Sequence, residues 1–421
     1  LCVIGGAPLP VDDRLTLAQC GIQANSSVQV AGRLLGGVEV AIRGRQHAVD
    51  ARGRLDLRDQ DLGPEEVKEI AAFLATSAGG AVSSLCCTNN PGMVGELDDS
   101  GRLKTPDVHA EVFKQLTDSL KISKVTEVDF SSCGIGPVAL GHLSDWVRDA
   151  TGAVDVVVLS GNMITGSRTA TSFEDYKVLC GDSTISSWNS GRVFCDLDLS
   201  GLISLCEALP GLKNPIHLDL ANCSLSVNGV NELGKAIAAG GAIARLTLSG
   251  NMITGSRDEG VSFITDWKYD LDLSGLISLC DALPTLKNPI ELDLSNCGLS
   301  VNGINPLAKA MAAGAAIARL VLNGNTITNY GKDLSGLTAL CDVLPTRKNP
   351  ISLVLADCNL KVAEVNELAR AMVAGAALTS VNCLHNPLGE GVHIIIKVFE
   401  ETPRLRTLCG FEEGVEQIDW S

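Results

Sequence analysis

Cysteine and histidine are the residues of this 421-residue sequence best suited to nucleophilic or metal chemistry, and a repeat governs the cysteines. Periodic cysteines favour core packing in a reducing compartment over disulfide bonds. The six histidines lie in unrelated positions, and no Cys-x-x-Cys pair accompanies a histidine pair. We therefore expect no catalytic residues, cofactor or metal, and no enzymatic activity. The periodic sets are Cys133, Cys223, Cys297 and Cys358, and Cys206, Cys280 and Cys341.

The repeat is clearest in residues 195–251, which return with small changes as residues 269–325. Each copy contains two half-units, one reading L-x-L-x-x-C and the other L-x-L-x-x-N. Two leucines with one residue between them point to the same side of a short strand. The Asn that follows can bond the backbone of neighbouring turns, and a Cys there is a small, buriable side chain. An apolar-periodic helix follows each turn.

The second leucine of each half-unit serves as a marker, and about ten markers fall between residues 52 and 410. The Cys-type markers are Leu57, Phe130, Leu220, Leu294 and Leu355, with Gln60 in the first Cys position. The Asn-type markers are Cys87, Leu159, Leu248, Leu322 and Cys383, and their turn residues are Asn90, Asn162, Asn251, Asn325 and Asn386.

This pattern resembles the leucine-rich repeat family, and the alternation of Cys and Asn resembles its ribonuclease-inhibitor-like subclass. The resemblance implies an α/β solenoid shaped as a horseshoe, with parallel strands on the concave side and helices on the convex side. We expect this solenoid over residues 52–410, with a C-terminal cap or tail over 411–421. Residues 38–51 alternate apolar and polar side chains, which predicts a linker or N-terminal cap in the form of a strand or short hairpin.

Residues 1–37 differ from the repeats and resemble the C-terminal half of ubiquitin. The resemblance rests on Gly6, Leu9, Asp13, Thr16, Leu17, Ile22, Gln23, Ser26, Arg33, Leu34, Gly36 and Gly37. It implies a partial β-grasp unit, although the bulky recognition patch of ubiquitin is reduced to Val3 and Ala31 and the segment contains no lysine. Gly36 and Gly37 fit either a protease processing site, with cleavage after Gly37, or a hinge.

Extra residues enter the array at one point, directly after the Asn turn. Marker spacing is 28 to 30 residues from a Cys-type to an Asn-type unit, but 33 to 61 in the other direction. Insertions at one point of a solenoid map to loops on one edge, which is often the binding edge. These loops hold eight of the fifteen aromatic residues, which either anchor a partner or pack down as small satellite cores. We select Tyr176, Trp188, Phe263, Trp267 and Tyr269 as candidate partner-binding residues.

The middle residue of each L-x-L points out of the concave face. In four Cys-type units it is an aspartate, which predicts an acidic row, here called the Asp row: Asp56, Asp129, Asp219 and Asp293. Arg245 and Arg319 precede two of the Asn-type strands and flank it. The row would attract a basic protein partner, or else would serve as a solvated surface.

The net charge of −16 argues against nucleic acid and anionic membranes as partners. We predict a monomeric scaffold for protein–protein interaction in the cytoplasm or nucleus, using the concave face and the loops of one edge. A first alternative is a ubiquitin-like fusion precursor that a deubiquitinase-like protease cuts after Gly37. A second is a regulator of a small GTPase or another enzyme by occlusion, which the fold analogy allows.

Overall fold

A computed structural model describes residues 38–150, 153–169, 172–180, 193–258, 267–374, 377–409 and 411–412, and the backbone of two short strands before them. These two strands, β1 (Val3–Ile4) and β2 (Ala7–Pro8), pair antiparallel. Gly36 and Gly37 lie outside the described residues. The ubiquitin-like unit and the processing site therefore stay predictions.

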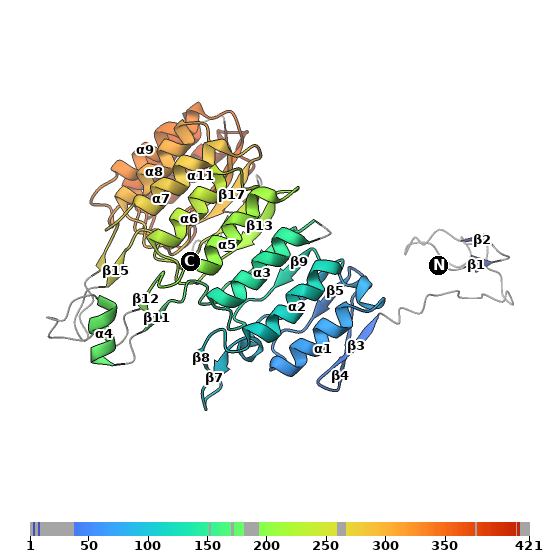
Figure 1. Cartoon of the computed structure of the whole chain (residues 1–421). Coiled ribbons are helices and arrows are strands. Elements are labelled where there is room, and N and C mark those ends of the chain that lie inside the picture. The colour runs from blue at the N-terminus through green and yellow to red at the C-terminus, as the bar shows by residue number, and fades with distance from the viewer. Residues whose placement is uncertain are drawn as a thin grey trace.

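One sheet of twelve strands runs the length of the array (Figure 1). Its first eleven strands follow chain order and pair in parallel, and only the last pair is antiparallel. The strands are β5 (Arg54–Asp56), β6 (Ser84–Cys86), β9 (Glu127–Asp129), β10 (Val156–Val158), β13 (Ile216–Asp219), β14 (Ile243–Thr247), β17 (Ile290–Asp293), β18 (Ile317–Val321), β19 (Ile351–Val354), β20 (Leu378–Asn382), β21 (Thr407–Leu408) and β22 (Phe411–Glu412).

Helices cover one face of this sheet, and no helix of the described ranges covers the other face, here called the open face (Figure 1). They are α1 (Pro64–Leu74), α2 (Ala110–Ile122), α3 (Pro137–Asp149), α5 (Ser200–Ala208), α6 (Val227–Ala238), α7 (Ser274–Ala282), α8 (Val301–Ala312), α9 (Ser335–Val343), α10 (Val362–Ala374) and α11 (Gly391–Glu400). Short 3-10 turns occur at Gly79–Ala81 and Pro91–Met93, and follow α5, α7 and α9 at Leu209–Gly211, Leu283–Thr285 and Leu344–Thr346. Strands are spaced about 4.8 Å apart whereas a helix is about 10 Å wide, so the stack curves with the sheet inside.

The core lies between the sheet and the helices, where the sequence predicted it. All ten marker residues are fully buried, including Phe130 and the two cysteine markers, Cys87 and Cys383. Phe113 of α2 packs edge-on against Phe130, with ring centroids 5.3 Å apart. A long parallel sheet with one helical layer fits the predicted leucine-rich repeat solenoid.

A hairpin covers the first strand of the sheet, as a repeat array with an exposed terminal strand requires, whereas residues 413–421 of the expected C-terminal cap lie outside the described residues. At the start, β3 (Glu39–Ile42) and β4 (Arg45–Ala48) form the expected hairpin. Val40 and Ile42 are buried in the core, and Val49 bridges to Leu55 of β5. At the other end, β22 turns back antiparallel along β21.

Candidate protein-binding face

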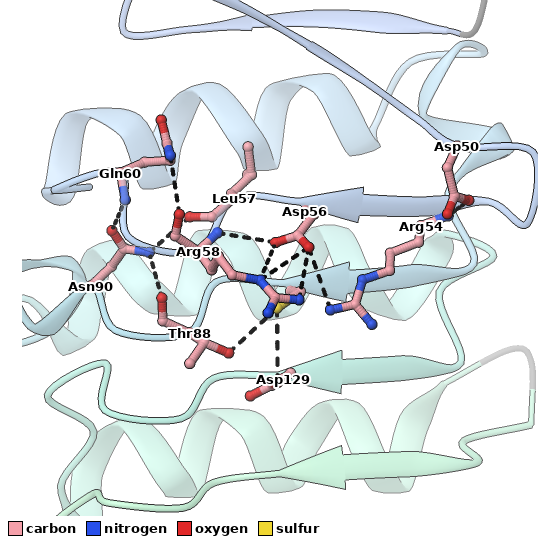
Figure 2. A network of polar contacts seen from close by, with 10 residues as sticks. Asp50, Arg54, Asp56, Leu57, Arg58, Gln60, Thr88, Asn90 and Asp129 are labelled. Atoms are coloured by element: carbon pink, nitrogen blue, oxygen red, sulfur yellow. Dashed lines mark hydrogen bonds and ion pairs between the residues drawn. The ribbon is translucent and has the colours of Figure 1, made fainter.

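A network of buried and partly buried asparagines holds neighbouring strands in register. Asn251 Nδ2 donates to the Leu220 and Leu248 carbonyls, both at 2.8 Å, and its Oδ1 accepts from the Cys223 and Leu225 amides at 3.1 and 2.9 Å. The same four bonds recur at Asn90, Asn162, Asn325 and Asn386. Figure 2 shows Asn90 linking the chain at Leu57 and Gln60 to its own turn. The predicted role of the Asn is confirmed.

The Cys-type thiols do more than fill space. Cys223 Sγ donates to the Leu159 carbonyl at 3.2 Å, so it bonds backwards to the preceding repeat. Cys133, Cys297 and Cys358 make the equivalent bond. Sequence reasoning treated these cysteines as small apolar residues only and missed the donor role. Their shared position three residues after the Cys-type marker was the available signal, because equivalent positions of parallel repeats align.

Burial should make these thiols unreactive in the native protein. It raises the pKa of Cys223, Cys297 and Cys358 to about 12, well above the usual value. Because the thiolate is the reacting species, a disulfide reagent should modify them slowly at pH 8, and raising the pH to about 9.5 should speed the reaction of the unfolded chain only. Peptide mapping after labelling with and without urea checks this. Rapid native labelling at Cys223 would contradict the burial.

The sheet register brings the Asp row together on the open face. Asp56, Asp129, Asp219 and Asp293 align across the sheet, with Cys86, Val158 and Thr247 between them on the alternate strands. Successive aspartates are therefore about 9.6 Å apart, two strand spacings. Burial raises the pKa of Asp219, and the negative charges of Asp129 and Asp293 raise it further, so the three carboxylates interact.

Each aspartate of the row also closes the turn after its own strand. Asp129 Oδ1 accepts from the amide and hydroxyl of Ser131, at 3.1 and 2.7 Å, and Asp293 does the same with Ser295. Neither predicted interpretation of the row, partner attraction or solvation, included this structural role. Asn382 occupies the same position in β20 and its Oδ1 accepts the Leu384 amide, so an asparagine can replace the aspartate in this turn.

Asp56 differs from the other three because cations neutralise it. Figure 2 shows Asp56 between two arginines, Arg58 at 2.8 Å and Arg54 at 3.6 Å. The guanidinium of Arg58 holds the pKa of Asp56 below its usual range. Within the described part of the chain, Asp129, Asp219 and Asp293 have no such ion pair. The attractive part of the row therefore runs from β9 to β17.

Arg245 and Arg319 lie in a second row of the open face, two residues before the first. The register there is Arg245, Glu291, Arg319 and Ser352 on successive strands. Arg245 Nε donates to Glu291 Oε2 at 2.8 Å, whereas Arg319, among the residues that the structure describes, reaches only the Ser352 hydroxyl at 3.5 Å. Glu291 was not singled out in the sequence. Its position two residues before Asp293 was the available signal.

The insertions form two-stranded antiparallel ribbons that project from one edge of the array, which we call the insertion edge (Figure 1). The ribbons are β7 (Glu96–Leu97) with β8 (Leu103–Thr105), β11 (Arg168–Thr169) with β12 (Val193–Phe194), and β15 (Arg257–Asp258) with β16 (Trp267–Lys268). The second carries a helix, α4 (Phe173–Cys180). Each directly follows an Asn turn, as the spacing predicted.

The aromatic candidates divide between exposed and buried positions. Trp267 is 43% exposed and stacks on Tyr269 with centroids 6.2 Å apart, and Tyr330 of the next insertion is 47% exposed. Partial burial raises the pKa of Tyr269, and the neighbouring hydroxyl of Tyr330 raises it further, so the side chains of two insertions lie close together in one aromatic cluster. Phe194, in contrast, is buried. Trp188 and Phe263 lie outside the described residues, and Tyr176 lies in α4 with its side chain not described.

The insertions also supply aspartates that cap later helices, which sequence reasoning missed. Asp270 accepts the Ser300 and Gly303 amides at the start of α8, and Asp196 makes the same bonds to Ser226 and Gly229 at α6. Asp107 caps α3 in the same way. The available signal was the repeated Asp-x-Asp motif at residues 196–198 and 270–272. Its second aspartate accepts the first amide of the helix that follows it, α5 or α7.

Removing one of these caps should weaken a helix that lies 30 residues further along the chain. Asp270→Ala should lower the free energy of unfolding by about 1–2 kcal/mol, as other N-cap losses do. Asp281→Ala, at an exposed position of α7, should change it by less than about 0.5 kcal/mol. Urea denaturation of the two variants compares them, and equal stabilities would rule out the capping role.

Several known proteins are similar in sequence to part of this chain. No family model matches the chain. The human "NACHT, LRR and PYD domains-containing protein 13" is 29% identical over 219 residues, which are 51% of this chain and 19% of the relative. Protein 5 of the same description from Bos taurus is 28% identical over 211 residues, 49% and 17% of the two chains. The mouse ribonuclease inhibitor is 26% identical over 204 residues, 47% and 39%. These similarities support a leucine-rich repeat protein.

Leucine-rich repeat relatives of this kind suggest a binding role. The chain spans less than a fifth of the length of the first two relatives. Among the described residues, no group of three or more His, Cys, Asp and Glu is arranged to hold a metal ion. None of the helices in the described ranges has the length and apolar character needed to cross a membrane.

Proposed function

We propose that this chain is a scaffold that holds a protein partner on the open face of its sheet and along the insertion edge. The observation that carries the proposal is the register, which aligns Asp129, Asp219 and Asp293 on a face that no described helix covers. Three carboxylates in one line, without an ion pair to any described residue, favour a partner with a basic surface and speed its encounter. The aromatic cluster of Trp267, Tyr269 and Tyr330 suits an anchor at the edge of the same surface.

Neutralising the Asp row tests this function without disturbing the turns. In the triple variant Asp129→Asn, Asp219→Asn, Asp293→Asn, the amide oxygen can still close each turn, as Asn382 does. Association with partners captured from the native cell should slow about ten-fold at low salt, and the difference should shrink as salt is added.

The matched control removes the same charge from the helical side. Glu207→Gln, Asp281→Gln and Glu390→Gln change exposed positions away from the open face. Quantitative mass spectrometry of the captured proteins compares the two variants with the wild type. If both variants lose the same proteins to the same extent, the effect is one of net charge and the open-face proposal fails.

The processing alternative concerns residues 1–37 and the bond after Gly37. A ubiquitin-like unit followed by Gly36-Gly37 would suit a deubiquitinase-like protease, and the product would begin at Val38. Val38 already takes part in the N-terminal hairpin, because its carbonyl accepts the Val49 amide at 2.7 Å. N-terminal sequencing of the protein from its native cell decides this, since an uncut chain leaves Gly36-Gly37 as a hinge. Stimulated GTP hydrolysis in a panel assay would instead support the GTPase-regulator alternative.

A further inference from the structure

The open face is hollowed where three strands of the best-matched repeats meet. The hollow has a volume of about 520 Å³ and takes side chains from β14, β17 and β18. Its lining residues are Arg245, Thr247, Glu291, Leu292, Asp293, Arg319, Val321 and Asn323. Most of them are polar or charged, unlike the apolar lining of a typical small-molecule pocket. The lining therefore suits a polar segment of a protein.

Two of the four charged side chains in the hollow form an ion pair with each other. Arg245 is paired with Glu291, so this pair presents little net charge to a ligand. Arg319 has no carboxylate partner among the described residues. Within the described ranges, Asp293 uses only Oδ1, for the Ser295 turn, and its Oδ2 makes no hydrogen bond or ion pair. The hollow thus offers one unpaired cation and one unpaired anion.

The distance between these two groups follows from the register. Arg319 pairs with Glu291 on the adjacent strand, and Asp293 is two residues further along that strand. One strand spacing and two residues of rise separate their Cα atoms by about 8 Å. In an extended chain, side chains two residues apart lie on one face about 6.7 Å from each other. An acidic and a basic residue with one residue between them can therefore reach both groups.

We propose that this hollow recognises an extended segment of the partner in which an acidic and a basic side chain are separated by one residue. This inference rests on the proposed function. The acidic side chain pairs with Arg319, whose planar guanidinium suits a two-bond contact with a carboxylate. The basic side chain pairs with Asp293. The segment needs no apolar groove, because the charges fix its position and direction.

The aromatic cluster gives the same segment a second contact. Asn323 lines the hollow, and Thr326, three residues on, lies close enough to Tyr269 to lower the pKa of its hydroxyl. Three residues span at most about 11 Å, so the hollow and the cluster of Trp267, Tyr269 and Tyr330 are neighbours. The segment continues from the charge pair to this edge, where a bulky apolar side chain contacts the exposed Trp267.

A random-peptide display library selected on the full chain tests the recognition. Wild type should enrich peptides with the acid-x-base spacing, often with a nearby apolar residue. Arg319→Glu should lose the acidic preference and Asp293→Asn the basic one, each by about ten-fold or more, which is the effect of one charge pair. Both should keep their fold, since Arg319 makes only one long contact and Asn can close the turn.

The control is Lys309→Glu, which makes the same charge change at an exposed position of α8. It should select the same peptides as wild type. Selection without the charge spacing, no enrichment at all, or wild-type selection by Arg319→Glu would each overturn the inference. A partner that still crosslinks to the open face in that case would leave the proposed function standing and remove only the inference about its sequence.

Discussion

Asn251→Ala should lower the free energy of unfolding by about 3–5 kcal/mol. The side chain is fully buried and makes four hydrogen bonds to the backbone of two repeats. Alanine leaves two amides and two carbonyls without these partners, and each buried unsatisfied group costs about 1–3 kcal/mol, part of which relaxation recovers. Asn251→Asp should cost nearly as much, because a carboxylate cannot donate to the Leu220 and Leu248 carbonyls.

Asn228→Ala is the matched control. Asn228 is exposed on α6, and its loss should change stability by less than about 0.5 kcal/mol. Urea denaturation gives the stabilities, and hydrogen exchange shows where the loss falls. Since repeats contact mainly their neighbours, protection should decrease first in β13 and β14. A cost below about 1 kcal/mol for Asn251→Ala would contradict the network as the device that holds the strands.

Gly275→Ala should destabilise the protein by about 3 kcal/mol through a backbone clash. Gly275 is the second residue of α7, and a Cβ there would lie 2.1 Å from the Val227 carbonyl oxygen at the start of α6. Neither backbone can move without shifting a packed helix, so the cost should be at the upper end for overpacking. Gly201 and Gly336 meet Pro137 and Val301 in the same way.

Gly141→Ala tests whether contact, and not glycine loss as such, causes the effect. Gly141 lies inside α3 with open space around its Cα, so alanine should stabilise this helix by about 0.5–1 kcal/mol. The midpoint temperature of thermal unfolding should then fall for Gly275→Ala and rise for Gly141→Ala, relative to the wild type. A Gly275→Ala protein as stable as the wild type would mean that the helices are not packed this closely.

The fold was predictable because every repeat reports the same geometry. The ten markers occupy equivalent positions of successive repeats and so identify the buried strand positions. Asn251 and Asn325 each lie three residues after a marker, and this spacing alone places them at the turn. The Asp row followed for the same reason, since equivalent positions of parallel repeats must align.

The pairing of individual charges was not predictable, because it depends on neighbours outside the pattern. Arg58 neutralises Asp56 in one repeat only, and Glu291 takes Arg245 but leaves Arg319 unpaired. The contact of Tyr269 with Tyr330 joins two insertions of different length, whose paths the repeat does not determine. Capping of α8 by Asp270 likewise connects residues 30 apart.

Photo-crosslinking from single sites tests most directly whether the open face holds the partner. A photoreactive residue at Thr247, on the open face beside the Asp row, is compared with one at Lys309, on the convex helix α8. Crosslinking in the native cell followed by mass spectrometry should give one recurring protein from Thr247, and the same protein from Trp267 on the insertion edge. Crosslinks to that protein from Lys309 alone, or none from Thr247, would contradict the proposed function.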